Sequence, residues 1–143
     1  MKRLLIILAT SVIGCGAVVP VDAIDCAHGP SWQCEAQAIA WNQTMGQEDE
    51  PPPVQWLDGE ACGYTGGERC IPGMQHLGLY LSGPRYIQIA IQPNEHASAL
   101  TLAHEFLHAH LDRAFGDPDI SHLRPEWKTM LPAIGETLSS AGL

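Results

Sequence analysis

The spacing of apolar residues predicts two helices in the C-terminal half of the chain. Between residues 95 and 115 they recur every three or four positions, as on one face of a helix, and Gly116 ends the pattern. This stripe consists of Leu100, Ala103, Leu107, Leu111 and Ala114. A second stripe follows Pro125, which suits a first helical turn, and continues to Leu138, with Pro132 expected to break it.

Short strands are expected before these helices. Residues 85–92 alternate polar and apolar side chains and are rich in β-branched residues, which is typical of a half-buried strand. Residues 54–57 and 77–81 are two further candidates, separated by a glycine-rich stretch that indicates turns. If residues 86–91 form the edge of the sheet, their backbone can pair with an extended peptide.

A further helix is expected near the start of the domain, over residues 32–45, with Ser31 as its N-cap. The chain is long enough for one domain and too short for two full ones. Together the elements predict one α+β domain over residues 31–143. In it a small antiparallel sheet packs on the helix at residues 95–115, with additional N-terminal and C-terminal helices.

The first residues are typical of an export signal. Two basic residues precede an apolar run too short to span a bilayer, and the run ends at Cys15 in a segment (VIGC) that resembles a bacterial lipobox. Residues 1–14 are therefore interpreted as a lipoprotein-type signal peptide and residues 15–30 as a tether. This predicts a protein anchored in the cell envelope, at the bacterial outer membrane, by lipid on Cys15. The alternative is secretion without lipid after cleavage at Ala23.

The cysteine count agrees with lipidation, because five cysteines leave four once Cys15 carries lipid. In an exported chain four thiols suggest two disulfides, and the pairs Cys26/Cys34 and Cys62/Cys70 would each close a short loop. A zinc site made by all four thiolates is disfavoured, since neither pair has the two-residue spacing of a zinc knuckle.

The charge balance argues against nucleic acid as a partner. Two of the seven basic residues lie in the leader, so five remain after it, against all sixteen acidic residues. Such a surface repels phosphate backbones and anionic lipid headgroups.

The candidate chemistry lies in the middle of the helix at residues 95–115, which contains the sequence His104-Glu105-Phe-Leu-His108. Residues four apart lie on one helical face with Cβ atoms about 5–6 Å apart, so His104 and His108 can bind one tetrahedral ion, for which Zn²⁺ is expected. Glu105 lies beside the metal, where it can accept a proton from water that zinc has acidified. These are the parts needed to hydrolyse a peptide bond.

A catalytic zinc normally has a third protein ligand, expected after the helix ends. His122 is the preferred candidate because the turn-rich segment after Gly116 can bring it back to the ion. The alternatives are a carboxylate from Glu126 or Glu136, or from Asp117 or Asp119.

Two more polar residues of the same helix are open to interpretation. Asp112 lies one turn beyond His108 and either orients an imidazole or faces solvent. His110 points away from His108 and is expected to be structural or solvated.

This arrangement resembles the SprT-like and minimal gluzincin metallopeptidases, in which a His-Glu-x-x-His helix is followed by a histidine, a proline and an aromatic residue. Here the later positions are His122, Pro125 and Trp127, and the resemblance spans residues 87–131. It implies a zincin-type catalytic architecture. A metzincin is disfavoured because the glycine and third histidine of that group are absent after the motif.

The sequence therefore predicts an exported zinc metallopeptidase that acts on a protein or peptide, with Glu105 as general base. The alternative is a noncatalytic zinc-binding envelope lipoprotein with an interaction or structural role. Glu105 favours catalysis, because a protein that only binds metal has no need of a carboxylate at that position.

Overall fold

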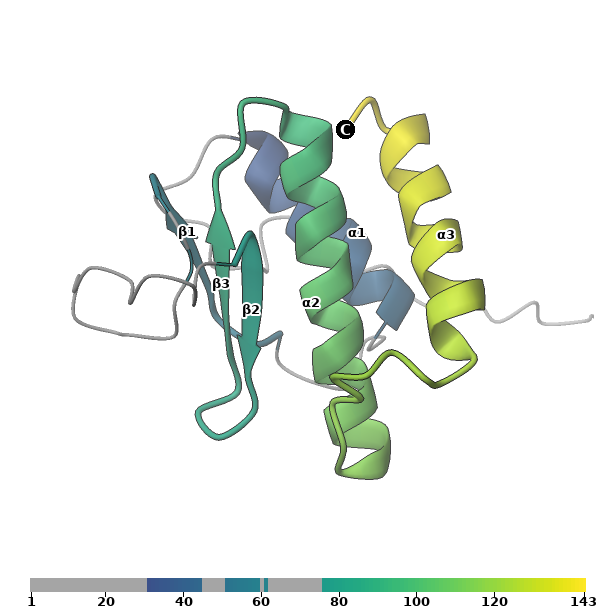
Figure 1. Cartoon of the computed structure of the whole chain (residues 1–143). Helices are drawn as coiled ribbons and strands as arrows, with labels where there is room; N and C mark the ends of the chain where they lie inside the picture. The colour runs from purple at the N-terminus through teal and green to yellow at the C-terminus, as the bar shows by residue number, and fades with distance from the viewer. Residues whose placement is uncertain (1–30, 45–50, 60, 62–75) are drawn as a thin grey trace, which may run out of the picture.

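The structure, a computed structural model, describes residues 31–44, 51–59, 61 and 76–143. These residues form three helices and a small sheet of three strands (Figure 1). In chain order the elements are α1 (Ser31–Thr44), β1 (Val54–Leu57), β2 (Gly78–Leu81), β3 (Tyr86–Ala90), α2 (Glu95–Phe115) and α3 (Glu126–Ser140). Each predicted helix and strand is present, and the α+β class is confirmed.

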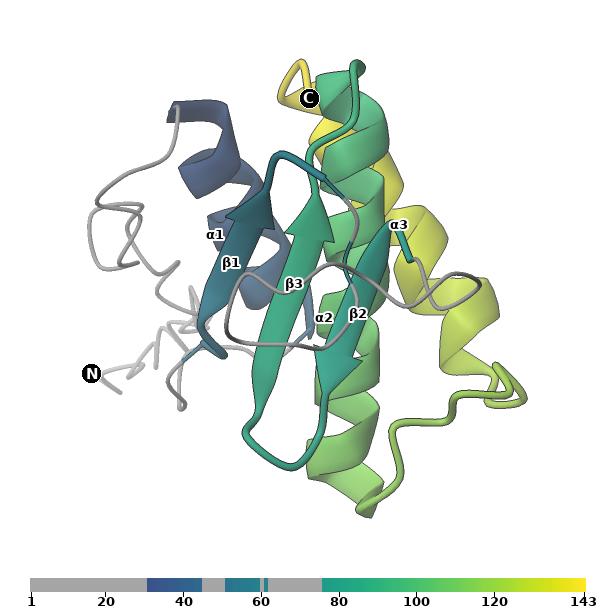
Figure 2. The ribbon, with the colours of Figure 1, turned by 60° about the vertical axis from the view of Figure 1, so that its left-hand side comes forward.

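The sheet is mixed, with strand order β1-β3-β2 (Figure 2). β2 pairs with β3 antiparallel, with Gly78 opposite Ile89, whereas β1 pairs with β3 parallel, with Val54 opposite Ile87. The prediction of an antiparallel sheet is therefore wrong for β1. The long connection after β1 leads to β2 on the far side of β3, and the β2–β3 hairpin then returns β3 alongside β1. The strand at residues 86–90 is thus central, and β1 and β2 are the outer strands of the sheet that the described residues form.

The central position also explains why β3 is buried on both faces, although its sequence indicated a half-buried strand. Ile87 and Ile89 are fully buried, and Gln88 between them is only 1% exposed. The Gln88 Nε2 atom donates a hydrogen bond to Gln55 Oε1 on β1 at 3.1 Å. A polar residue flanked by a strand on each side can be buried because a neighbouring strand supplies its partner.

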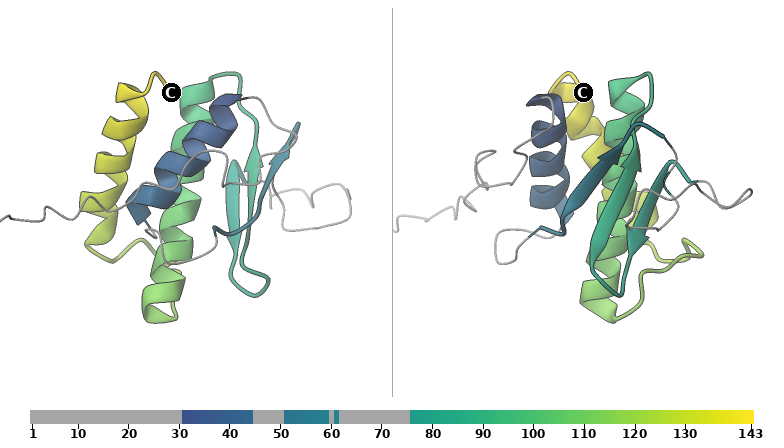
Figure 3. Two further views of the ribbon diagram at one scale, coloured as in Figure 1. Left: turned by 180° about the vertical axis from the view of Figure 1, so that it is seen from behind. Right: turned by 90° about the vertical axis from the view of Figure 1, so that its left-hand side faces the viewer.

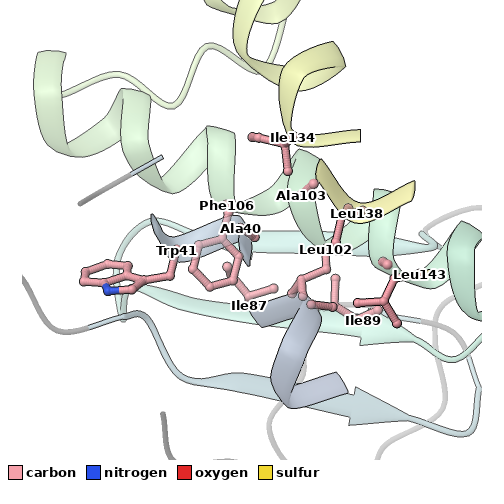
Figure 4. Close-up of a cluster of buried hydrophobic side chains, with 12 residues drawn as sticks. Ala40, Trp41, Ile87, Ile89, Leu102, Ala103, Phe106, Ile134, Leu138 and Leu143 are labelled. Atoms are coloured by element: carbon pink, nitrogen blue, oxygen red, sulfur yellow. The ribbon is translucent and has the colours of Figure 1, made fainter. Parts of the chain in front are cut away.

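All three helices lie on one face of the sheet, and α2 packs against β2 and β3 (Figures 2 and 3). α1 and α3 pack against α2 and against each other. The side chains between these elements form one apolar cluster (Figure 4). Its largest fully buried members are Trp41, Ile87, Ile89, Leu102, Phe106, Ile134 and Leu138. Each such side chain contributes about 1.5–3 kcal/mol through burial, so the core fixes α2 firmly.

The ends of α2 follow from its sequence. Asn94 caps the N-terminus, where its side chain accepts a hydrogen bond from the His96 backbone N–H at 3.0 Å. Gly116 ends the helix in the left-handed conformation, with φ of 70°, and its N–H donates to the Asp112 carbonyl. The predicted end is thereby confirmed.

Pro132 does not break α3, contrary to expectation, because the helix continues to Ser140. A proline inside a helix removes one hydrogen bond and normally costs about 3 kcal/mol. Here Pro132 is exposed, while Ile134 and Leu138 on the same helix are buried in the core. This packing holds the helix together across the proline.

The predicted signal peptide (1–14) and tether (15–30) lie outside the described residues, as do Cys15, Cys26, Cys62 and Cys70. Lipidation and the disulfide pairing therefore stay predictions; only Cys34, in α1, is described. Within the described ranges, no helix is long and apolar enough to cross a membrane.

Candidate metal centre

Three histidines meet beside the middle of α2. His104 and His108 lie one turn apart on α2, with ring centroids 4.9 Å apart. His122 comes from the loop between α2 and α3, and its Nε2 atom lies 3.1 Å from His104 Nε2 and 3.3 Å from His108 Nε2. The structure therefore brings together the three residues predicted as metal ligands.

The spacing of these nitrogen atoms fits one metal ion. Ligand atoms about 2.0–2.1 Å from a tetrahedral ion lie about 3.3–3.4 Å from one another. The ligand atoms of the three histidines all lie within 4.8 Å of one another, and two of the nitrogen pairs match the tetrahedral spacing closely. The three histidines can bind a metal ion.

The orientation of His108 is fixed by a backbone contact. Its Nδ1 atom lies 2.6 Å from the Pro118 carbonyl oxygen, a distance at which the ring donates an N–H to that oxygen. The neutral tautomer then carries its proton on Nδ1 and keeps the Nε2 lone pair for a metal.

Burial keeps two of the imidazoles uncharged. It lowers the pKa of His104 to about 4, assisted by the neighbouring His108 and His122 rings, and it also lowers the pKa of His108. A metal ligand must be a neutral imidazole, so no proton has to leave these two rings near neutral pH.

The loop that carries His122 is built around Asp119. The Asp119 carbonyl accepts the His122 backbone N–H at 2.9 Å, and its side-chain Oδ2 accepts the Arg124 backbone N–H at 2.8 Å. Asp119 and His122 both have positive φ angles, 51° and 55°. Such angles are uncommon outside glycine but are best tolerated by Asn, Asp and His. The loop therefore makes a tight double turn that points His122 back at α2.

Trp127, the second residue of α3, covers the histidines. Its ring centroid lies between 4.4 and 4.8 Å from those of all three imidazoles. The indole Nε1 donates a hydrogen bond to Asp119 Oδ2 at 2.8 Å. The aromatic residue singled out by the family resemblance thus contacts each predicted ligand.

Glu105 lies on the side of α2 that faces β2 and is 6% exposed. Burial raises its pKa to about 7, although a hydrogen bond from the Tyr80 backbone opposes this shift. A carboxyl group with a pKa near 7 exchanges a proton easily at neutral pH, as a general base must.

The alternative ligands do not join this group. Asp119 turns its carboxylate toward Trp127 and Arg124, and Asp117 Oδ1 accepts the Asp119 backbone N–H at 2.9 Å. Glu126 interacts electrostatically with His110, and Glu136 is exposed on α3. Of the candidates for the third ligand, only His122 approaches the other two histidines.

The two other polar residues of α2 have structural partners. Asp112 Oδ2 accepts a hydrogen bond from the Tyr80 hydroxyl at 2.8 Å, so it ties α2 to β2 instead of orienting an imidazole. Burial lowers the pKa of His110, opposed by the charge of Glu126 and a hydrogen bond with the Thr44 backbone. His110 therefore links the three helices, which agrees with a structural role.

Sequence reasoning missed Gly78, Tyr80 and Pro118. Gly78 carried a signal, because glycine inside a strand often marks a close approach of another group. The contacts of Tyr80 with Glu105 and of Pro118 with His108 come from backbone atoms, which the identity of a side chain does not reveal.

Comparison with known protein families, with curated proteins and with solved structures found no match for this chain. Its function must therefore be argued from the site itself.

Proposed function

We propose that this protein is an exported zinc metallopeptidase with His104, His108 and His122 as zinc ligands and Glu105 as general base. One observation carries the proposal. Three imidazole nitrogens lie within 4.8 Å of one another, with two of the pairs at the spacing of a tetrahedral ion, and the residue next to the first histidine is a buried glutamate whose pKa is raised to about 7.

The donor set favours zinc among the common metals. Three neutral nitrogens suit zinc and other late transition metals, whereas Ca²⁺ and Mg²⁺ prefer oxygen ligands. A catalytic zinc site usually has three protein ligands, and its fourth position is left for water or substrate.

The chain's own groups supply the proton transfers of hydrolysis. Zinc held by His104, His108 and His122 would supply a Lewis acid that lowers the pKa of water. Glu105 accepts a proton from the attacking water as the new C–O bond forms, and then donates that proton to the amide nitrogen as the C–N bond breaks. The products are a carboxylic acid and an amine, and Glu105 returns to its starting state.

A protein or peptide substrate has a suitable place to lie. Among the described residues β3 is the one strand that pairs with β2, so the other edge of β2 is open in that part of the chain, and it adjoins Glu105 through Gly78 and Tyr80. An extended peptide that adds to this edge would place a peptide bond near the general base. Residues 86–91, which the sequence suggested as the peptide-binding edge, cannot provide it, because β3 is the central strand.

Localisation and partners rest on the sequence. The lipobox-like segment ending at Cys15 supports anchoring in the cell envelope through lipid, with secretion as the alternative, and the excess of acidic residues argues against nucleic acid.

A noncatalytic zinc-binding lipoprotein is the competing proposal. Glu105 discriminates between them, because holding a carboxyl group in a buried position costs stability, and a protein that only binds metal gains nothing from it. The buried glutamate therefore favours the peptidase.

The test combines metal analysis of the purified domain with a screen of a broad peptide library, with and without a chelator. We expect about one zinc per chain and cleavage that stops on chelation and returns on adding zinc. Stoichiometric zinc without any cleavage would support the noncatalytic lipoprotein, and absence of zinc would refute both.

A further inference from the structure

We propose that Asp119 and Trp127 form a positioning pair that sets the geometry of the metal centre by holding His122 against the two histidines of α2. The inference rests on the proposed metal site, but not on peptidase activity. It concerns how well the three ligands are held before a metal arrives.

Trp127 is placed to act on all three ligands together. Its indole ring packs on each imidazole, with interplanar angles of 42° to His104, 62° to His108 and 86° to His122. The helix that carries it is fixed in the core through Ile134 and Leu138. A flat, rigid side chain on a packed helix restricts the rotation of three imidazoles that otherwise have freedom about their side-chain bonds.

Asp119 connects α3 to the loop that carries His122. One oxygen, Oδ2, accepts hydrogen bonds from the Trp127 indole and from the Arg124 backbone, both at 2.8 Å. The Asp119 carbonyl accepts the backbone N–H of His122. A single residue thus holds His122 on one side and the start of α3 on the other.

The hydrogen bonds to Asp119 also support the conformation of the loop. Its Oδ2 atom accepts from two donors, and its backbone carbonyl accepts from the His122 N–H. The loop conformation needs such support, because Asp119 and His122 both have positive φ angles.

A purely structural role predicts a different outcome from a positioning role. If the pair only stabilises the fold, substitutions should lower the melting temperature of the metal-free protein and leave zinc affinity unchanged. If it positions His122, zinc affinity should fall, and the fall should depend on the presence of His122.

The experiment measures zinc affinity by chelator competition, and the visible spectrum of the Co²⁺-loaded protein, for Asp119→Asn and Trp127→Phe. Trp127→Phe keeps an aromatic ring and removes the indole N–H, so it preserves folding. We expect each variant to bind zinc about 10–100-fold more weakly, with an altered Co²⁺ spectrum, and the double variant to be no worse than either single one. Asp112→Asn is the matched control, because it also loses one side-chain hydrogen bond of 2.8 Å, but to Tyr80.

Asp119→Asn is then made in His122→Ala, where it should have no further effect on zinc affinity, because Asp119 holds His122 through its backbone carbonyl. Wild-type zinc affinity in both single variants would overturn the proposal, and so would an equal loss from Asp119→Asn in the His122→Ala background. Zinc binding that behaves as expected in a protein without peptidase activity would uphold the positioning pair while refuting the proposed catalysis.

Discussion

Gly78 on β2 lies directly against Glu105 on α2. A Cβ atom added to Gly78 would come within 2.8 Å of both Cγ and Oε1 of Glu105, and within 2.7 Å of Thr101 Cγ2. Only glycine allows the edge strand to approach the helix this closely, so the strand forms one wall of the buried site that holds Glu105.

Gly78→Ala should therefore displace Glu105 or β2. We expect a loss of about 1–3 kcal/mol in the free energy of unfolding, as for overpacked cores, and reduced peptidase activity with unchanged zinc content. Gly83→Ala is the control, because nothing lies within 4 Å of a Cβ atom at that position. Equal stability and activity in the two variants would show that the contact between Gly78 and Glu105 affects neither folding nor activity.

The raised pKa of Glu105 predicts how stability depends on pH in the metal-free protein. Its pKa rises from 4.5 to about 7 on folding, so the folded protein holds this proton more tightly and the group costs stability as pH rises between those values. Glu105→Gln removes the ionisation. The variant should match the wild type near pH 4 and exceed it by about 3 kcal/mol at pH 8, since one pKa unit corresponds to 1.36 kcal/mol.

Denaturant unfolding at the two pH values measures this difference. The comparison of variant with wild type isolates Glu105 from His104, whose lowered pKa acts in the opposite direction. A stability difference that does not change with pH would contradict burial of an ionisable Glu105.

Much of the scaffold could be predicted from the sequence because it depends on local pattern. The apolar stripe of α2, its end at Gly116 and the four-residue spacing of His104 and His108 are all properties of one helix. The pairing of strands is not local. β1 and β2 have only four residues each, so their sequences do not specify which side of β3 each occupies or in which direction.

The third candidate ligand was predictable only as a preference among several residues. His122 lies in a loop, where no periodicity fixes the direction of a side chain, and its position depends on the turn around Asp119 and on the contact with Trp127. The sequence offers Asp119 only as an alternative ligand, and its hydrogen bond with the indole joins residues eight positions apart. Such contacts follow from the tertiary fold.

His122→Ala should lower zinc affinity and activity together, because it removes one of three nitrogen ligands. His110→Ala should leave both nearly intact. His110 forms a hydrogen bond with the Thr44 backbone and interacts electrostatically with Glu126, and it is not part of the metal site. Zinc content and cleavage rate measured on the two variants separate these outcomes. Equal effects of the two substitutions would contradict the assignment of His122.

Cys15→Ser tests the interpretation of the leader. Lipid attachment requires the thiol, so the variant should leave the membrane fraction or stay unprocessed, whereas the wild type should remain in it. Fractionation and N-terminal sequencing distinguish the two. Soluble wild-type protein that begins at Ile24 would instead support secretion without lipid.

In the proposed mechanism the three histidines bind the metal and Glu105 performs the proton transfer. The most direct test is the cleavage rate of Glu105→Gln, measured on protein with the same zinc content as the wild type. Glutamine keeps the shape of the side chain but cannot accept a proton from water, so we expect full zinc content and a rate lowered about 10²–10⁴-fold. Undiminished cleavage by this zinc-loaded variant would contradict the mechanism.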